Sequence, residues 1–219
     1  MRCALVFAVF AACADPSDAP PDAVPERGWA TYTIAAGAHD AHLTGREPKN
    51  PIDGVVSVVG RDFELALNPS AIYTIVDPAV DQFDWNKLPG LSDCGTIDLS
   101  VDGAMFGWRW NLDAQVLEVT AYANNAGTHL SLPAPLFTLD AAQLAAESPL
   151  RYRVVREQTQ YRFSVTGPGI AADATLPRRC TSEVRDPLAW AGAFYFGGTS
   201  TAPHEVTAKI REMPFSESP

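Results

Sequence analysis

Residues 81–94, DQFDWNKLPGLSDC, bring carboxylate, amide, amine and aromatic side chains together in one turn-rich stretch. Proteins hold sugars by hydrogen bonds to amides and carboxylates and by an aromatic face, and this stretch contains both kinds of group. We therefore expect a ligand-binding loop; the alternative is a crossover loop whose polar side chains satisfy its own backbone. The candidate ligand-binding residues are Asp84, Trp85, Asn86, Lys87 and Asp93.

A second candidate is Arg109, within MFGWRWN at 105–111. Alternation along a strand puts Arg109 on the face opposite Trp108 and Trp110, which we expect in the core because large aromatic side chains dominate sandwich interiors. A guanidinium in that position can clamp a carboxylate or stack on a ring. The alternative is a solvated strand residue or an internal ion pair.

The third candidate is His204, which follows Pro203 at the start of the final strand-like run. Proline fixes φ and lacks an N–H, so we expect His204 at the rim of a sheet. If the first and last strands are neighbours, His39 and Asp40 would approach His204 and Glu205, and these side chains could ligate a metal. We favour a hydrogen-bonded corner with a binding rim, and we predict no metal or other cofactor, with calcium left open.

Motifs of the common enzyme classes are missing from the sequence. HExxH, GxSxG, a glycine-rich phosphate loop and the paired carboxylates Glu-x-Asp-x-Glu do not occur. We therefore expect a binding module rather than an enzyme. The alternatives are a carbohydrate-active enzyme, a lyase or hydrolase that uses Lys87, Arg109, Tyr122 or His204, and a structural or assembly lipoprotein.

The composition indicates a globular, acidic protein. The chain has 219 residues, of which 47% are hydrophobic and 19% charged, with a formal net charge of −10. This length favours one domain. A chain this acidic lacks the basic surface that displaces counterions from nucleic acid, and it also lacks a polybasic patch for anionic lipid.

The N-terminus has the pattern of an export signal. A single arginine precedes an apolar run that is too short to span a bilayer, and small residues follow. FAAC at 10–13 resembles the lipobox of bacterial lipoproteins, which implies lipidation of Cys13 after removal of the leader. The alternative is ordinary cleavage at the A-x-A site 12–14. Residues 14–28, rich in Pro, Asp and Ala, then form a disordered tether.

An exported chain places its remaining cysteines in an oxidising compartment. With Cys3 and Cys13 in the leader region, Cys94 and Cys180 are left, and we expect them to form a disulfide. A cross-link that closes so long a loop contributes at most roughly 4–5 kcal/mol. Free thiols are the alternative; a zinc site is disfavoured because the sequence has no CxxC.

Hydrophobic residues recur with a period of two from residue 29 onward. About ten short runs with turn residues between them predict an all-β antiparallel sandwich, a concanavalin-A-like jelly roll, over a single domain 29–213 followed by a tail 214–219. A short helix is expected near 140–147, capped by Asp140. The expected strands lie in the runs 29–34, 55–59, 63–67, 70–76, 105–111, 116–124, 150–155, 160–165, 188–196 and 204–210.

Several phrases of the sequence recur together in one group of proteins. These are SAIY at 70–73, NKL with Gly90 and SDC at 86–94, FGWRW at 106–110, Arg179-Cys180, and YFGG with APH at 195–204. In these motifs the chain resembles uncharacterised secreted bacterial proteins, over about residues 30–212. The resemblance implies a jelly roll outside the cytoplasm. The chain departs from the pattern at 95–104, GTIDLSVDGA, where the group has a histidine-rich stretch.

Taken together, the sequence predicts an exported, lipid-anchored, non-catalytic β-sandwich that binds carbohydrate or a surface polymer. Its expected location is extracytoplasmic, as an outer-membrane or cell-surface lipoprotein, or else secreted or periplasmic. The membrane is expected as a partner only through the lipid anchor, and nucleic acid is not expected as a partner.

Overall fold

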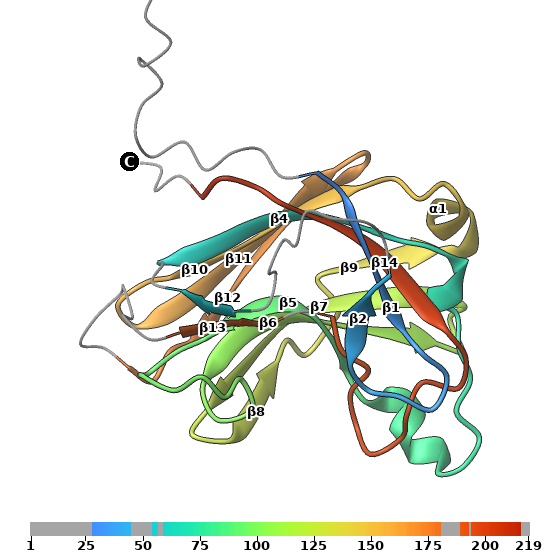
Figure 1. Cartoon of the computed structure of the whole chain (residues 1–219), viewed down its shortest axis with the longest axis horizontal. Coiled ribbons are helices and arrows are strands. Elements are labelled where there is room, and N and C mark those ends of the chain that lie inside the picture. The colour runs from blue at the N-terminus through green and yellow to red at the C-terminus, as the bar shows by residue number, and fades with distance from the viewer. Residues whose placement is uncertain (1–27, 45–53, 57–58, 181–188, 193, 216–219) are drawn as a thin grey trace, which may run out of the picture.

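The computed structural model describes residues 28–44, 54–56, 59–180, 189–192 and 194–215. Two antiparallel sheets lie face to face and enclose the core (Figure 1). The predicted fold class, an antiparallel β-sandwich of the jelly-roll kind with a short helix, is confirmed. No helix in these described ranges is long and apolar enough to cross a membrane. The predicted leader, Cys13 and all but the last residue of the tether lie outside the described residues.

Sheet A forms the upper layer in Figure 1 and contains both the first and the last strand. Its strands, in spatial order, are β12 (Ile170–Pro177), β11 (Gln160–Gly167), β10 (Leu150–Arg156), β4 (Gly60–Leu67), β14 (Val206–Glu212), β1 (Ala30–Ile34) and β2 (Ala41–Leu43). Strand β1 pairs antiparallel with β14, with Ala30 opposite Ile210, so the expectation that the first and last strands are neighbours is confirmed.

Sheet B forms the lower layer in Figure 1. Its strands, in spatial order, are β3 (Gly54–Val56), β13 (Ala189–Gly192), β5 (Asn86–Ser92), β6 (Gly103–Asn111), β7 (Val116–Asn125) and β8 (Thr128–Ser131), and β9 (Phe137–Asp140) pairs with part of β7. Two 3-10 helices, η1 (Pro69–Ala71) and η2 (Ala79–Phe83), and the helix α1 (Ala141–Ala145) lie in the connections.

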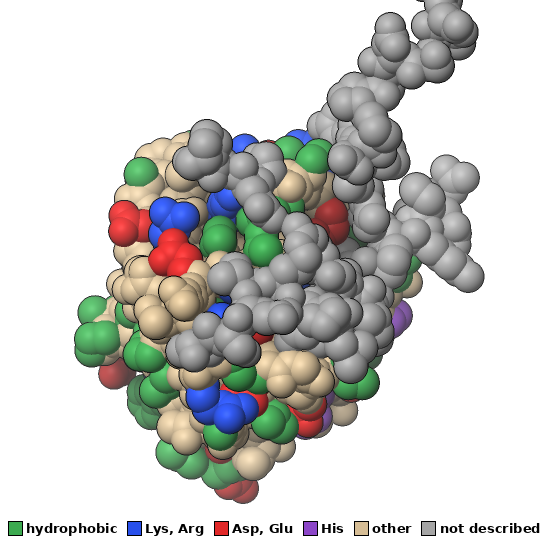
Figure 2. Space-filling view, turned by 90° about the vertical axis from the view of Figure 1, so that its left-hand side faces the viewer, with side chains coloured by type: hydrophobic (Ala, Val, Ile, Leu, Met, Phe, Trp, Pro, Cys, Tyr) green, Lys and Arg blue, Asp and Glu red, His purple; other side chains and the backbone are tan. Residues whose placement is uncertain are grey.

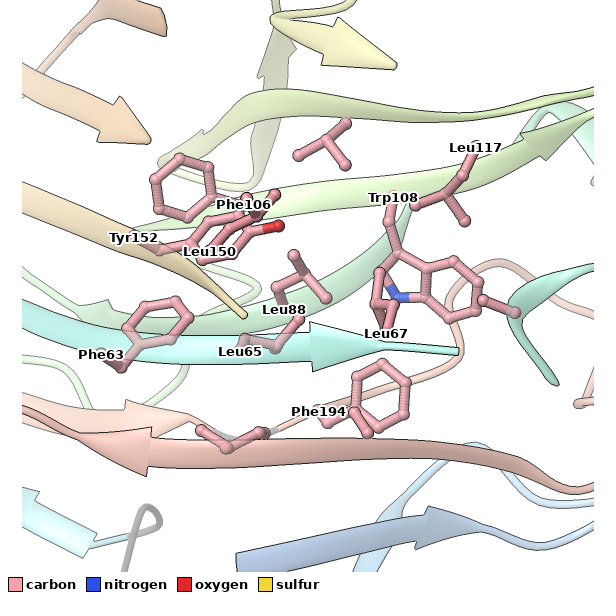
Figure 3. Packing of buried hydrophobic residues seen from close by; sticks show 14 of the residues in the cluster. Phe63, Leu65, Leu67, Leu88, Phe106, Trp108, Leu117, Leu150, Tyr152 and Phe194 are labelled. Carbon is pink, nitrogen blue, oxygen red and sulfur yellow. The ribbon is translucent and has the colours of Figure 1, made fainter. Parts of the chain in front are cut away.

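Aromatic and aliphatic side chains from both sheets meet in the core (Figure 3). Trp108 is fully buried, and its ring packs edge-on against Tyr73 and nearly parallel to Phe194. Phe106 packs in the same core against Tyr152 of the opposite sheet, with ring centroids 5.0 Å apart. The expectation that the tryptophans of FGWRW are core residues is confirmed.

Alternation along β7 decides which of its side chains reach the outer face of sheet B. Leu117, Val119 and Ala121 of β7 belong to the hydrophobic core. Period-two geometry then turns Glu118 and Tyr122 to the outer face. The same face carries Arg109 of β6, which lies opposite Glu118 in the ladder.

Two sequence predictions are corrected by the structure. Residues 70–76 were expected as a strand but begin with η1, because the Asn68 side chain accepts a hydrogen bond from Ser70 N at 2.9 Å and Pro69 occupies the first helical turn. Residues 81–94 were expected as a loop, yet β5 runs through 86–92 in the middle of sheet B, with a register shift between Lys87 and Gly90 that accommodates Pro89.

The predicted helix near 140–147 is present but shorter. Strand β9 continues to Asp140, and α1 begins at Ala141. Asp140 accepts a hydrogen bond from Gln143 N, and the Gln143 side chain accepts one from Asp140 N, which is a reciprocal capping box. The predicted cap is therefore confirmed.

The disulfide between Cys94 and Cys180 is present, with Cα atoms 5.6 Å apart. It lies next to a buried ionic cluster. Asp93 accepts hydrogen bonds from the Tyr161 hydroxyl and from two nitrogens of Arg178, and its carboxylate lies 3.4 Å from Arg156 Nε. Burial by itself would raise the pKa of Asp93, but the Arg178 hydrogen bonds and the Arg156 charge hold it below its usual range.

Cationic side chains on the surface are paired with acidic ones. Arg151 and Arg153 of β10 both contact Asp62, and Arg211 of β14 contacts Glu64. Figure 2 shows Lys and Arg side chains next to Asp and Glu on one face of the molecule.

Candidate functional site

A cleft of about 1320 Å³ opens on the outer face of sheet B. Its floor is formed by β5, β6 and β7, and loops together with β8 rise on two sides. In Figure 1 these loops hang below sheet B, with the loop before β6 and β8 on one side and η2 with the loop before β14 on the other. The polar and aromatic side chains that line the cleft include Asp40, Phe83, Asp84, Trp85, Lys87, Asp98, Tyr122, Asn124, His129 and Tyr195.

The first wall is built from two segments that are distant in the sequence. Lys87 N donates to Tyr195 O at 2.8 Å, and Tyr195 N donates to Lys87 O at 2.9 Å. Asn86, which is buried between them and the core, accepts from Gly197 N and donates to the Tyr73 hydroxyl. Asn86 therefore joins this wall to the core rather than facing the cleft.

The double glycine 197–198 lets its own segment approach residues 84–86 closely. A Cβ atom at Gly197 would overlap the carbonyl oxygen of Trp85, and one at Gly198 would overlap the carboxylate of Asp84. Gly198 also has φ of +79°, a conformation that side-chain-bearing residues rarely adopt. The two glycines thus fix the position of Asp84 and Trp85 at the cleft.

Trp85 forms an aromatic shelf on the first wall. Its Cβ lies over Gly107 of the floor, where a methyl group would come within 3.3 Å of it. The guanidinium of Arg109 lies 4.0 Å from the centroid of the Trp85 ring, and Arg109 Nη1 donates to Phe83 O. Arg109 also pairs with Glu118 at 2.7 Å. Arg109 itself does not line the cleft; the ion pair that was the alternative in the sequence is present, and the ring on which Arg109 stacks is that of Trp85.

Lys87 reaches across the floor toward Tyr122. Its Nζ lies 4.0 Å from the centroid of the Tyr122 ring and donates a hydrogen bond to Trp85 O. Burial lowers the pKa of Lys87 to about 8, although the nearby Asp84 carboxylate acts in the opposite direction. Burial, and then the Asp84 charge, raise the pKa of Tyr122 to about 12. An amine, a phenol and a carboxylate therefore meet in the centre of the cleft.

The second wall consists of the loop 95–101 and strand β8. Asn124 of β7 donates to Leu99 O and bonds through Oδ1 to His129 Nδ1 at 2.6 Å. Asp98 at the rim accepts hydrogen bonds from Ser100 N and Oγ. This loop follows directly on Cys94, so the disulfide with Cys180 anchors the residue at which the loop leaves the sheet.

The structure brings together part of the predicted site and disperses the rest. Asp84, Trp85 and Lys87 line the cleft, and Arg109 supports Trp85. Asn86 and Asp93 are buried in structural roles, and His204 Nε2 bonds to Ser70 O at 2.9 Å next to η1, so that none of these three lines the cleft.

The two histidines considered as metal ligands have separate partners. His39 Nδ1 bonds to Phe196 O at 2.8 Å, and the His39 ring stacks on Tyr195. His204 instead bonds to Ser70 O. Within the part of the chain that the structure describes, no three His, Cys, Asp or Glu side chains are placed to hold a metal ion.

Sequence reasoning left out several residues of the cleft, among them Asn124, His129 and Tyr195. Asn124 follows Tyr122 by two positions, so strand alternation alone could have placed it on the same face. His129 lies opposite Asn124 in the β7–β8 ladder, and Tyr195 forms an antiparallel bridge with Lys87 of β5. These two contacts depend on long-range pairing.

No protein-family model matches the chain, and no curated protein matches it. Among solved structures, it is similar to the alginate lyase vAL-1 from Chlorella virus, with 13% identity and a TM-score of 0.43, over 83% of this chain and 81% of the lyase. It is similar to the GH43 protein BlXynB from Bacillus licheniformis, with 13% identity and a TM-score of 0.42, over 71% of this chain and 27% of BlXynB.

A third similar structure is the CBM2 module of the evolved Dit of Lactobacillus casei BL23 phage J-1, with 6% identity and a TM-score of 0.36, over 76% of this chain and 70% of that one. At identities and TM-scores this low, similarity establishes nothing about the site. The cleft is therefore interpreted from its own residues.

Proposed function

We propose that the protein binds a carbohydrate in the cleft on sheet B and does not act on it chemically. The observation that carries this proposal is the cleft of about 1320 Å³, in which aromatic faces lie beside carboxylate, amine and amide groups. Ligand sites are concave, with apolar and aromatic walls and a few convergent polar groups. A sugar presents an apolar C–H face and a rim of hydroxyls, which match these two kinds of group.

The aromatic shelf supports the proposal most directly. The Trp85 side chain packs against both Gly107 and the guanidinium of Arg109, two outward-facing positions of β6. Because the Trp85 side chain is already ordered, it loses little rotational freedom when a ligand stacks on it, and more of the stacking energy then contributes to affinity.

The test is retention of the purified protein on an array of glycans and cell-surface polymers. We expect dissociation constants in the micromolar to millimolar range for at least one glycan. Absence of any retained glycan at millimolar concentration contradicts the proposal. A protein recovered only with protein partners would instead favour the structural or assembly alternative.

A second candidate function is proton transfer on the bound sugar, as in a lyase or hydrolase. One observation favours it: Lys87, with a pKa of about 8, lies against Tyr122 in the cleft. An amine with such a pKa can accept a proton near neutral pH, and a phenol can donate one. Release of new reducing ends from a polysaccharide panel, abolished by Lys87→Met, would establish this function over simple binding.

We also propose that the chain is exported and attached to a membrane through Cys13 alone, so that it binds its glycan or surface polymer outside the cytoplasm. The support is the leader and the FAAC sequence. Mass spectrometry of the native protein should find Cys13 as a lipidated N-terminus. An intact Met1 would contradict export, and a free Ala14 or Asp15 terminus would favour ordinary secretion.

A further inference from the structure

Two oppositely charged groups, those of Asp84 and Lys87, line the cleft and form no salt bridge with each other. Lys87 Nζ has a hydrogen bond to Trp85 O and a contact with the Tyr122 ring, and no described carboxylate lies within the salt-bridge distance of 4.0 Å. Asp84 lines the same cleft and has no side-chain hydrogen bond within the described ranges. Each group thus retains hydrogen-bonding capacity that points to a ligand.

Both groups are held in place before any ligand arrives. The Asp84 carboxylate lies against Gly198, where even a methyl group would displace it. Lys87 Nζ is held by its hydrogen bond to Trp85 O and by its contact with the Tyr122 ring. A preorganised donor and acceptor bind a ligand with little loss of side-chain entropy.

The charge of the cleft selects against acidic ligands. Three carboxylates, those of Asp40, Asp84 and Asp98, line it, and Lys87 is the one Lys or Arg among the lining residues within the described part of the chain. The whole chain carries a formal net charge of −10. A polyuronate or a sulfated glycan would therefore be repelled during approach and in the cleft.

A vicinal diol of a neutral sugar carries hydroxyls that complement both groups. One hydroxyl donates to a carboxylate, and its neighbour accepts from an ammonium, so a single diol uses both. We propose that Asp84 and Lys87 together bind a vicinal diol of an uncharged glycan, which is stacked on Trp85. This inference rests on the proposed function and adds the class of ligand and the residues that select it.

The test compares ligands and variants by calorimetric titration. The probes are neutral cello-, xylo- and manno-oligosaccharides, and oligogalacturonate and oligoguluronate of equal length. We expect binding of a neutral oligosaccharide and none of the uronates. Asp84→Asn and Lys87→Met should each weaken that binding by about 10- to 100-fold, the range for loss of a charged hydrogen bond. The matched controls, Asp113→Asn and Lys209→Met, change charges outside the cleft and should leave it unchanged.

A second measurement does not depend on the variants folding. Analogues of the bound sugar that lack either hydroxyl of the diol should bind the wild-type protein about tenfold or more weakly. As a separate check in folded Asp84→Asn, the analogue that lacks the hydroxyl facing position 84 should show little further loss, because the two changes remove the same interaction.

The outcomes separate this inference from the proposed function. Preference for a uronate, or neutral binding that survives both Asp84→Asn and Lys87→Met, overturns the diol site and leaves carbohydrate binding standing. Deoxy analogues that bind as well as the parent sugar also overturn it. Failure of the wild-type protein to bind any glycan refutes the proposed function itself, and the diol site falls with it.

Discussion

The guanidinium of Arg109 lies 4.0 Å from the centroid of the Trp85 ring while its Nε donates to Glu118 at 2.7 Å. The ion pair orients the guanidinium, and the guanidinium in turn supports one side of the ring. An arginine shared between a carboxylate and an aromatic face holds the ring more firmly than either contact alone. The orientation of the aromatic shelf thus depends on two strands, β6 and β7.

The shelf yields a direct prediction about affinity. Trp85→Ala should weaken glycan binding by about tenfold or more, because a large buried aromatic contact is lost. Trp29→Ala is the matched control: Trp29 also has an arginine over its ring, Arg211 at 4.9 Å, but it does not line the cleft. Equal effects of the two variants, measured by titration of the same oligosaccharide, would contradict the location of the site.

Binding should depend on pH through Lys87, whose pKa burial lowers to about 8. Below this pH the ammonium is present and donates to the ligand, so affinity is constant; above it the charge is lost and affinity falls. Asp84 and Tyr122 face the same amine, and Tyr122, with a pKa of about 12, stays neutral through this range.

Titrations across pH 6 to 10 check this, with Lys87→Met expected to bind weakly and without the fall. A rise in turnover above pH 8 would have the opposite sign and would indicate that Lys87 acts as a base.

Gly197→Ala should damage the site and the fold together. The added methyl group would overlap Trp85 O, and the surrounding segments can yield only by moving apart. Overpacking of this kind typically costs about 1–3 kcal/mol of unfolding free energy. Gly28→Ala, where no atom lies within 4 Å, is the control for an added methyl group. Urea unfolding that gives the same midpoint for both variants would show that the close approach is not needed.

Asp93→Asn should destabilise the protein by roughly 3–5 kcal/mol, because Arg156 and Arg178 would keep buried charges without their carboxylate. The pKa of Asp93 is lowered by folding, so its contribution is present above the unfolded pKa of about 4 and is lost as the pH falls further. The unfolding free energies of wild type and variant, measured at pH 7 and at acid pH, should differ less in acid. A difference that is constant with pH would argue against this role.

Replacing both cysteines of the disulfide, Cys94→Ser with Cys180→Ser, should lower the unfolding free energy by about 2–4 kcal/mol. Because the loop 95–101 that follows Cys94 forms one wall of the cleft, we also expect weaker glycan binding in the folded double variant. Thermal unfolding and titration measure the two effects separately. Unchanged affinity in a folded variant would show that the wall is held by Asn124 and the rest of its contacts.

Local patterns were sufficient to predict the strands in which hydrophobic residues alternate. In β7 the apolar residues Leu117, Val119 and Ala121 recur every second position, and these are the buried ones. The same rule placed Arg109 opposite the core tryptophans. The disulfide also followed from counting, because one pair remained after the leader cysteines were set aside.

Strand β5 could not be predicted in this way, because Pro89 and Gly90 are both rare in strands. The strand persists because it is buried between β13 and β6 and a register shift absorbs the irregular residues. For residues 70–76 the error is the reverse, because a strand was predicted where the chain begins with a 3-10 turn. Their composition favours a strand, but the Asn68 cap and Pro69 start a 3-10 turn.

The site was predicted where its residues are close in sequence and missed where it depends on pairing. Asp84, Trp85 and Lys87 lie within four positions and were all identified. Tyr195 and His129 join them only because β5 meets the segment 194–198 and β7 meets β8. The sequence around each residue does not indicate these partners, because the contacts depend on which strands become neighbours in the folded sheet.

The pairing of β1 with β14 has a practical consequence. The N-terminal end of the described domain leaves from sheet A, on the side of the sandwich away from the cleft (Figure 1). A biosensor chip that captures the protein by a tag placed directly before the described domain therefore presents the cleft to the flowing sample, so surface-based and solution measurements of affinity should agree.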